Sequence, residues 1–357
     1  MNVSHVLLYR YTIPLTEPVS VKGHRLRQRE GIVLALKSRE GDVTAYGEIA
    51  PLPGLHRETL SAAEAQLFDL LSRHEYTFSG PLPEGLFPSV RTGIEIALLN
   101  YQAAVSGNPP SIFPETEALE YLPLNALLFG DPDSIVQKAE KLFELGYRVF
   151  KLKVASGNTI NALESIGILH RRFGGQIELR LDANQSFSFD EALAFARRIP
   201  EDSVSYIEEP LQDASGIGEF HARTAIKSAL DETLWQRPEL LYSIPSEALR
   251  ALVLKPNRLG GISASLDLVR HAEKNGLQAV FSSAFESGIS LCVYAWLAAS
   301  SSRTPVACGL DTFRYLEHDL LESPFGSDSS MIDTRKTYLN GQRINRRALK
   351  LASIWTL

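Results

Sequence analysis

Short apolar segments that end in charged residues recur at regular intervals along the middle of the chain. The five segments are Phe150–Val154, Leu179–Asp182, Val204–Glu209, Ala229–Glu232 and Leu252–Lys255. Their charged residues at positions 153, 182, 208, 231 and 255 are 29, 26, 23 and 24 residues apart. One strand followed by one helix occupies about this length, so the pattern predicts consecutive βα units of a parallel barrel.

The charged strand ends change in type along this predicted barrel. Lys153 comes first, three carboxylates follow, and Lys255 comes last. A charge at the end of any one strand is explained by the strand reaching the surface. In a (β/α)₈ barrel, however, all strand C-termini open on one face, where active sites are built. Five successive charged ends in this order therefore favour a shared site.

The same pattern assigns the other barrel strands. Leu122–Phe129 is expected to be the first strand, and the helix after it has an apolar stripe and ends at Gly146. Gln278–Ser283 is the predicted seventh strand and Pro305–Cys308 the eighth. No helical pattern follows Leu310, so the predicted fold class is α/β, with a modified (β/α)₈ barrel of about (β/α)₇β.

Residues before the barrel lack this rhythm and predict an α+β capping domain. The segments with the β-branched and aromatic content of strands are Val6–Tyr11, Ile32–Lys37 and Val43–Ile49. Gly41-Asp42 is a plausible hairpin turn between the last two. The polar and basic segment Glu17–Gly31 is either a solvated loop or a flap that closes over a substrate.

Two helices, over Arg57–Arg73 and Val90–Ala104, are expected to complete the capping domain before Gly107 and Pro109-Pro110 end the helical run. The predicted division is a capping domain over residues 1–118, a barrel over 119–312 and a tail over 313–357. The tail mixes short polar and apolar pieces. We expect it to leave the barrel and to pack back against the capping domain.

Composition and charge narrow the class of protein. With 44% hydrophobic and 22% charged residues, the 357-residue chain is typical of an enzyme, and its net charge of −6 gives no basic footprint for nucleic acid. The longest apolar run, Leu291–Ala299, is too short to span a membrane, and no secretory signal is apparent. Cys292 and Cys308 are expected to be buried thiols in a reducing cytoplasm. Nothing in the sequence specifies an oligomeric state.

The residue types at the strand ends suggest metal-assisted proton chemistry. The candidate carboxylates are Asp182, Asp231 and one of Glu208 or Glu209. Such hard oxygen ligands suit Mg²⁺ or Mn²⁺ better than zinc. Lys153 and Lys255 flank them, and a lysine near other cations has a lowered pKa and can act as a base. A substrate carboxylate at the metal would then lose its α-proton to one lysine.

These segments carry a family resemblance. The motifs are Lys-Leu-Lys at 151–153, Leu-Asp-Ala-Asn at 181–184, Ile-Glu-Glu-Pro at 207–210, Leu-Asp-Glu-Thr at 230–233 and Leu-Lys-Pro at 254–256. As a set they resemble the muconate-lactonizing branch of the enolase superfamily. The resemblance spans nearly the whole chain and implies an α+β capping domain, completed by the tail, over a modified barrel. It also implies a lysine base working with Mg²⁺, or Mn²⁺ in its place, on a small carboxylate substrate.

Within that branch the chain resembles the o-succinylbenzoate synthase family. The matching stretches are Arg27–Gly31, Tyr46–Gly54, Arg180, Ser282-Ser283, Glu286-Ser287 and Gly309–Thr312. This resemblance implies a hydro-lyase of menaquinone biosynthesis. The implied reaction is the dehydration of 2-succinyl-6-hydroxy-2,4-cyclohexadiene-1-carboxylate to o-succinylbenzoate through an enediolate.

The resemblance also implies a role for each site residue. Lys153 would take the α-proton and help the hydroxyl leave, while Lys255 would stabilise the anionic intermediate from the opposite face. Relatives with Glu-Gln-Pro leave only the first position as a carboxylate, so Glu209 lies behind the ligand. The implied metal ligands are then Asp182, Glu208 and Asp231. The implied supporting or substrate-binding residues are Lys151, which would tune Lys153, Arg180, Asn184, and Ser283 and Gly309 near the succinyl group.

Two other functions stay open at this point. Racemisation of N-acylamino acids, epimerisation of dipeptides or muconate cycloisomerisation would use the same lysines and metal with a different pocket. A barrel without catalysis would only bind a ligand or a partner. The complete set of two lysines and three carboxylates argues against the second function, because loss of catalysis would be expected to remove at least one of them.

Overall fold

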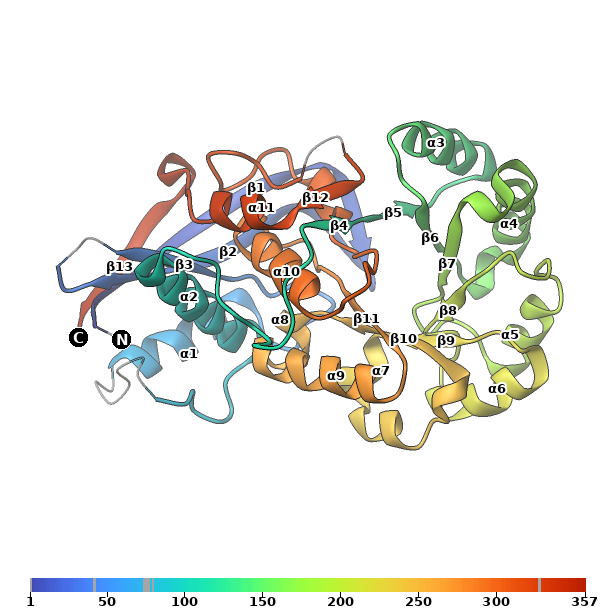
Figure 1. The fold of residues 1–357 in the computed structure, drawn as a ribbon, viewed down its shortest axis with the longest axis horizontal. Coiled ribbons are helices and arrows are strands. Elements are labelled where there is room, and N and C mark those ends of the chain that lie inside the picture. The colour runs from blue at the N-terminus through green and yellow to red at the C-terminus, as the bar shows by residue number, and fades with distance from the viewer. Residues whose placement is uncertain (1, 41–42, 73–77, 79, 327–328) are drawn as a thin grey trace.

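The computed structural model describes residues 2–40, 43–72, 78, 80–326 and 329–357. An antiparallel sheet with its helices lies beside a curled parallel sheet that is surrounded by helices (Figure 1). The α/β prediction with a modified barrel and an α+β capping domain is therefore confirmed. The predicted turn at Gly41-Asp42 lies outside the described residues.

The capping sheet has the strand order β13-β1-β2-β3. Its strands are β1 (Val3–Val21), β2 (His24–Ser38), β3 (Thr44–Ile49) and β13 (Lys350–Thr356). Alternate residues at the start of β1, such as Val6 and Leu8, are fully buried against α1 (Leu60–Ser72) and α2 (Pro88–Ser106). Because β13 pairs with β1, the end of the chain joins this sheet, and the two termini lie close together in Figure 1.

The parallel sheet has the order β11-β10-β9-β8-β7-β6-β5. Its strands are β5 (Asn125–Leu128), β6 (Val149–Lys153), β7 (Glu178–Asp182), β8 (Tyr206–Glu208), β9 (Ser228–Leu230), β10 (Leu249–Leu254) and β11 (Gln278–Phe281). Parallel bridges from Cys308 to Leu124 and from Gly309 to Ser282 connect its two edges. Of the predicted eighth strand at Pro305–Cys308, only Cys308 is thus paired, and the next residue, Gly309, forms the other bridge. Pro305 has no N–H to donate to a strand ladder, and pairing begins only at Cys308.

The first barrel strand also differs from its predicted range. The segment Leu122–Phe129 is divided at Leu124, and its first part belongs to β4 (Tyr121–Pro123), which pairs with β12 (Met331–Asp333) instead of the barrel. Only β5 continues into the parallel sheet. The tail is therefore paired at two places, through β12 and through β13.

Helices cover the outside of the parallel sheet and fill the junction between the two sheets. They are α3 (Pro132–Glu144), α4 (Thr159–Phe173), α5 (Phe189–Ala196), α6 (Ile217–Thr224), α7 (Glu232–Gln236), α8 (Pro256–Leu259), α9 (Ile262–Lys274), α10 (Gly288–Ser300) and α11 (Thr334–Asn340). Every residue of α10 is buried, which explains why its sequence is apolar on all sides. Among the described helices, none has both the length and the apolar content needed to cross a membrane.

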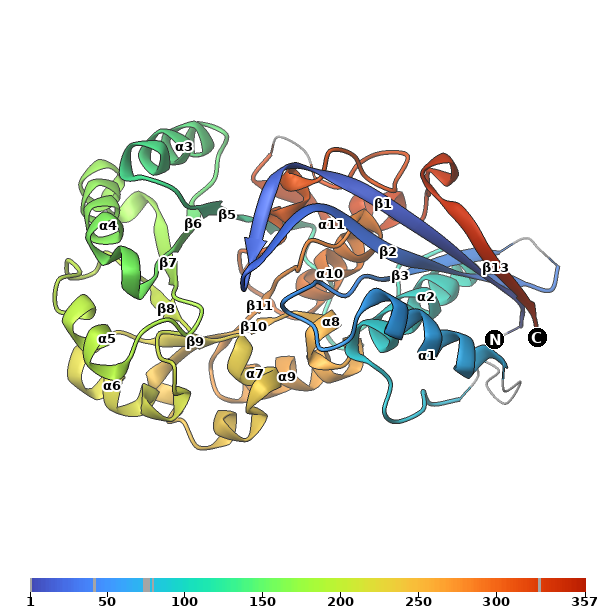
Figure 2. The same ribbon diagram turned by 180° about the vertical axis from the view of Figure 1, so that it is seen from behind.

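The polar segment Glu17–Gly31 forms the far end of a long hairpin and is not an irregular loop. Strands β1 and β2 pair along most of their length and turn at Lys22-Gly23, where both residues have positive φ, 42° and 84°. Figure 2 shows this hairpin reaching from the capping sheet toward the barrel. Residues 17–22 line the cavity at the barrel mouth, as a flap would.

Buried charged residues hold the capping sheet to the loop that follows β11. The Arg29 guanidinium is 2% exposed and donates to the carbonyl oxygens of Phe285, at 3.0 Å, and Ala50, at 2.9 Å. The Glu48 carboxylate accepts from the Ser287 N–H at 3.0 Å and from the Ser290 hydroxyl at 2.7 Å. These bonds fix one wall of the barrel mouth from the capping side.

Candidate active site

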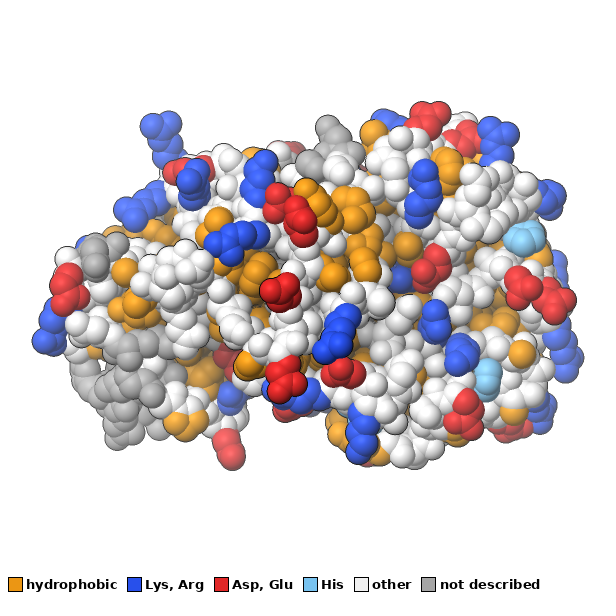
Figure 3. Space-filling model, viewed as in Figure 1, with side chains coloured by type: hydrophobic (Ala, Val, Ile, Leu, Met, Phe, Trp, Pro, Cys, Tyr) orange, Lys and Arg blue, Asp and Glu red, His pale blue; other side chains and the backbone are white. Residues whose placement is uncertain are grey.

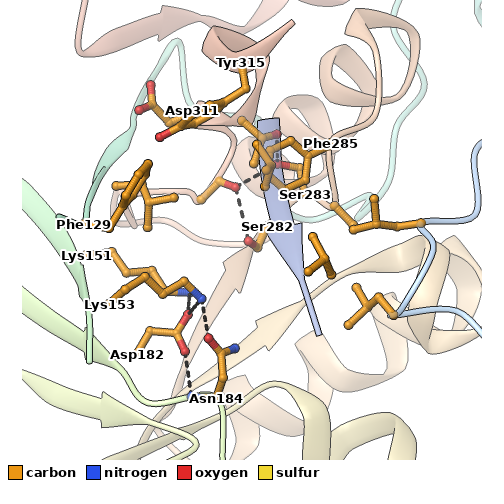
Figure 4. A pocket seen from close by; sticks show the side chains of 18 of the residues that line it. Phe129, Lys151, Lys153, Asp182, Asn184, Ser282, Ser283, Phe285, Asp311 and Tyr315 are labelled. Atoms are coloured by element: carbon orange, nitrogen blue, oxygen red, sulfur yellow. Dashed lines mark hydrogen bonds and ion pairs between the residues drawn. The ribbon is translucent and has the colours of Figure 1, made fainter. Parts of the chain in front are cut away.

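A cavity of about 820 Å³ lies at the C-terminal ends of the barrel strands, beneath the hairpin. Its wall contains Lys151, Lys153, Asp182 and Lys255 from the strand ends, as well as Glu17–Lys22 from the capping domain. Figure 4 shows the two lysines of β6 and Asp182 on one side of this cavity and the serines after β11 on another. The size and position of this cavity suit a small-molecule site.

Strand register brings the predicted residues together. Lys153 at the end of β6 is paired with Asp182 at the end of β7, and Asp182 is paired with Glu208 at the end of β8. Asp231 follows β9 directly, and Lys255 follows β10 directly. Three strands, β7, β8 and β9, therefore separate the strand of one lysine from the strand of the other.

Ion pairs connect these side chains. Lys151 Nζ lies 2.8 Å from Asp182 Oδ2 and 2.7 Å from Glu208 Oε1. Lys153 Nζ lies 2.6 Å from Asp182 Oδ2, and Lys255 is paired with Asp231 in the same way. Each carboxylate is thus held by at least one ammonium group.

Burial controls the charge of the carboxylates. The side chains of Asp182, Glu208 and Asp231 are each 1% exposed. Burial, and then the charge of Asp182, raise the pKa of Glu208 to about 8. Burial also acts on Asp182, but the charges of Lys151 and Lys153 outweigh it and lower its pKa well below the usual value. The neighbouring ammonium groups therefore keep Asp182 ionised but do not offset the burial of Glu208.

The lysines do not all follow the prediction of a lowered pKa. Burial alone would lower the pKa of Lys255, but the charges of Asp231 and Glu232 outweigh burial and raise it. The pKa of Lys151 is raised for the same reason, by Asp182 and Glu208. For Lys255 the expectation of a lowered pKa was wrong, because its nearest charges are carboxylates and not cations.

The carboxylates fit a divalent cation in residue type, burial and strand position. Asp231 Oδ1 is buried and has no hydrogen-bond partner in the described part of the chain. Hard oxygen ligands on three neighbouring strand ends match the preference of Mg²⁺ or Mn²⁺. As arranged here, with lysines on the carboxylates, no three acidic, histidine or cysteine side chains of the described residues converge as a ready ligand set. A cation would therefore replace ammonium groups as the partner of these oxygens.

Glu208 and Glu209 face different surroundings. The Glu209 carboxylate accepts hydrogen bonds from the backbone N–H groups of Asp231 and Thr233, both at 2.7 Å, and from the Thr233 hydroxyl at 2.8 Å. Glu208 instead meets Lys151 at the centre of the site. This geometry agrees with Glu208 as the candidate ligand and gives Glu209 a supporting role, because it holds the backbone on which Asp231 is carried.

The predicted substrate-binding residues fall into two groups. Ser283, Gly309 and Asn184 line the cavity, and the Ser283 hydroxyl donates to the Gly309 carbonyl at 3.0 Å. Arg180 is buried and is not part of the cavity wall; its guanidinium bonds Glu178 at 2.7 Å and the Ala307 carbonyl at 2.8 Å. Arg180 is therefore placed as a support inside the barrel.

Several wall residues had no place in the sequence-based site. They are Phe129, Phe285, Asp311, Tyr315 and Glu232, whereas the hairpin residues belong to the segment that was weighed as a loop or a flap. Phe129 stacks on Tyr315 with ring centroids 6.1 Å apart, and Phe285 meets the same tyrosine edge-on at 5.8 Å. Glu232 stands directly after Asp231 in the Leu-Asp-Glu-Thr motif, which was the one available signal for it.

Comparisons with known proteins agree with this geometry. A family model described as "Enolase C-terminal domain-like" matches residues 134–337, and one described as "MenC, N-terminal domain" matches residues 3–101. The chain therefore belongs to the enolase superfamily. Among curated relatives, the o-succinylbenzoate synthase of Haemophilus influenzae is 31% identical over 93% of this chain and 97% of that protein. "Protein PHYLLO, chloroplastic" of Arabidopsis thaliana is also 31% identical over 91% of this chain, which spans 22% of that longer protein.

Solved structures share the whole fold. The L-Ala-D/L-Glu epimerase from Bacillus subtilis, in a substrate-liganded complex, has a TM-score of 0.80 at 20% identity and matches over 93% of this chain and 96% of its own. A member of the enolase superfamily from Roseovarius nubinhibens, complexed with magnesium, has a TM-score of 0.81 at 18% identity, with 99% of each chain covered. At these identities the likeness describes the fold and not the substrate.

Proposed function

We propose that this chain is an o-succinylbenzoate synthase, which removes water from 2-succinyl-6-hydroxy-2,4-cyclohexadiene-1-carboxylate in menaquinone biosynthesis. The observation that carries the proposal is the placement of Lys153 and Lys255 in one cavity, with the strand ends of three buried carboxylates between them, of which Asp182 lines the cavity itself. Two relatives that match over 93% of this chain, and over 97% and 96% of their own length, bear that name at 31% identity. The likeness to epimerase structures is lower, at about 20% identity.

Asp182, Glu208 and Asp231 would hold Mg²⁺, and a superfamily relative of known structure is complexed with magnesium. When bound, the cation supplies positive charge that stabilises the enediolate form of the substrate carboxylate. Lys151 already forms ion pairs with two of the three carboxylates, Asp182 at 2.8 Å and Glu208 at 2.7 Å. This contact suits a residue that sets the charge of the site without touching the substrate.

Lys153 is the proposed base. Its unprotonated amine takes the proton from the α-carbon, and the resulting ammonium then gives a proton to the departing hydroxyl, which leaves as water. One residue serves both transfers because both groups lie on one face of the ring. Lys255 lies across the carboxylates and contributes fixed positive charge near the developing anion.

The rest of the wall suits a ring with an acidic side arm. Leu127, Phe129 and Phe285 give the cavity an apolar side on which a six-membered ring can pack. Ser283 and Gly309 lie at the end of β11 and its bridge, where the resemblance places the succinyl arm. The two ends of the substrate would thus meet different chemistry.

Purified protein with Mg²⁺ and the cyclohexadiene substrate tests the proposal. We expect o-succinylbenzoate to form at a rate typical of enzymes, about 1–1,000 per second. The matched measurement offers N-succinylamino acids under the same conditions. If these are racemised efficiently while the cyclohexadiene is not dehydrated, the proposed function is wrong.

Racemisation of N-acylamino acids is the second candidate, because lysines on opposite sides of a site permit proton transfer at both faces of an α-carbon. The same separation of Lys153 and Lys255 by three strands supports it. The two functions differ in what they require of Lys255. Dehydration needs only its charge, whereas racemisation needs it to exchange a proton with the substrate.

A further inference from the structure

A chain of polar contacts runs from the tip of the hairpin to the proposed base. Lys22 Nζ lies 3.7 Å from Glu232 Oε1, and the same oxygen accepts from Asn184 Nδ2 at 3.0 Å. Asn184 Oδ1 accepts from Lys153 Nζ at 2.6 Å. All four residues line the cavity, and Figure 4 shows Asn184 directed at the lysine pair. The capping domain thereby contacts the barrel chemistry through two intermediate residues.

Asn184 is the link whose orientation matters. Its backbone is in the left-handed region, with φ of 43°, and its N–H donates to Asp182 Oδ1 at 3.1 Å. The side-chain amide has one acceptor end and one donor end. Because Glu232 accepts from the donor end, the oxygen is left to face Lys153. If the amide turned over, its N–H groups would meet an ammonium group, which has no acceptor.

Glu232 is a buried acid with incomplete pairing inside the site. It is 1% exposed, and its Oε2 atom has no hydrogen-bond partner among the described residues. Lys22 forms an ion pair with it, with 39% of the lysine side chain exposed at the hairpin turn, and the charge of Lys255 on the next strand end also acts on it. A buried carboxylate without a cation is costly, so the approach of Lys22 stabilises both the charge of Glu232 and the closed hairpin.

We propose that Lys22 and Glu232 are a positioning pair that couples closure of the hairpin to the orientation of the base. Glu232 turns the Asn184 oxygen toward Lys153, and Lys22 joins Glu232 only when the hairpin covers the cavity. The inference rests on the proposed function, in which Lys153 is the base. Neither Lys22 nor Glu232 is required to touch the substrate.

A double-mutant cycle tests the pair directly. Lys22→Met and Glu232→Met are each expected to lower kcat/KM of dehydration about tenfold, because methionine at position 232 can neither pair with Lys22 nor hold the Asn184 amide, and the double variant should be no worse than either single variant. Most of the loss should appear in kcat, since the pair orients the base. Lys22→Arg, which keeps the charge, should recover most of the activity. Arg25→Met removes a charge from the same hairpin and is the matched control, expected to match the native enzyme.

Additive losses in this cycle would overturn the proposal. They would arise if Lys22 bound the substrate carboxylate itself, because Lys22→Met would then raise KM by the same factor with or without Glu232. The proposal would also be overturned if Arg25→Met lowered kcat/KM as much as Lys22→Met does. Any positive charge in the hairpin would then support the reaction, and the pair with Glu232 would not be specific.

A second readout needs no substrate. Trypsin can cut the hairpin at the exposed residues Arg25 and Arg27, and the closed hairpin should resist it. Glu232→Gln leaves these sites unchanged, so faster cleavage there in the variant is expected, and equal cleavage rates would overturn the pair. This result is independent of the reaction. Suppose that Glu232→Gln is cleaved faster than the native protein, but the native protein does not dehydrate the cyclohexadiene. Lys22 and Glu232 then stand as a contact that closes the hairpin, and the proposed function fails.

Discussion

The barrel mouth and the hairpin above it contribute to the same cavity in different ways. The strand-end carboxylates are 1% exposed and are fixed by neighbouring strands with matched register. The hairpin residue Lys22 has 39% of its side chain exposed and stands on a two-residue turn. From this comparison we expect the proton chemistry to belong to the buried strand ends and access to the site to depend on the exposed hairpin.

The two regions also differ in the charge that they bring. The barrel supplies the lysines and the carboxylates that would hold a cation. Changes at Asp182, Glu208 or Asp231 should therefore abolish the reaction. The hairpin supplies one cation and an apolar rim, so changes there should reduce the rate without removing the chemistry. The predictions below follow that order of effect.

Loss of one metal ligand should have the largest effect. Alanine at Asp182, Glu208 or Asp231 should remove measurable dehydration, because each leaves buried charge without its cation. Exhaustive chelation should do the same to the native protein, and added Mg²⁺ should restore it. Thermal unfolding provides the check, since a ligand bound only by the folded state raises Tm, and the three variants should lose this Mg²⁺-dependent rise. Full activity after chelation would contradict the account.

The two lysines should separate in isotope exchange. With a slow N-acylamino acid substrate in deuterium oxide, Lys153→Ala and Lys255→Ala should each exchange the α-proton of one enantiomer only. The surviving lysine faces that enantiomer, and the two variants should select opposite ones. Proton NMR of the α-position measures this outcome. Exchange of both enantiomers by either variant would show that the lysines do not work from opposite faces.

Shortening the hairpin should have a smaller effect. Val19 pairs with Leu26, so replacement of residues 20–25 by Asn-Gly keeps the strand register and removes the tip. The variant should lose roughly tenfold in turnover, an effect of about 1.4 kcal/mol, while its Mg²⁺ affinity stays at the native value. Unchanged kinetics would return the tip to the status of a solvated turn.

The last prediction concerns stability rather than rate, at the buried Glu286 in the loop after β11. Burial raises the pKa of Glu286 to about 7, from 4.5. Between these values the folded protein binds more protons than the unfolded chain, so stability falls as pH rises and stays lower above pH 7. As pH rises from 5 to 8, the native protein should therefore lose about 2 kcal/mol of unfolding free energy relative to Glu286→Gln, which has no carboxyl group to titrate at this position. The free energy of unfolding is measured with urea at each pH, and Glu273→Gln, a change at an exposed residue, is the control. If the two variants had the same pH profile, the raised pKa of Glu286 would be contradicted.

The barrel chemistry was predictable from sequence because strand periodicity and spacing together place residues in space. Lys153, Asp182 and Glu208 each end a short apolar run, and parallel pairing leaves little freedom in where they meet. Asp231 and Lys255 were predicted in the same way, because each comes directly after the next short apolar run at the same spacing. The lysine pKa was misjudged, because the nearest charges to Lys255 are carboxylates of neighbouring strands.

The hairpin contribution was not predictable in the same way. Glu17–Gly31 is polar, and polarity alone does not distinguish a loop from paired strands that cross between domains. The aromatic wall of Phe129, Phe285 and Tyr315 is built from three distant positions that only the closed barrel brings together. The final strand was overestimated because Pro305 interrupts pairing before Cys308.

The most direct test of the central claim compares the native protein with Lys153→Ala in dehydration of the cyclohexadiene substrate. Formation of o-succinylbenzoate is measured under saturating Mg²⁺, with circular dichroism used to confirm that the variant is folded. The account predicts a loss on the order of a hundredfold or more in kcat, since this residue carries both proton transfers. A folded Lys153→Ala variant that dehydrates the substrate at the native rate would contradict the assignment of Lys153 as the base.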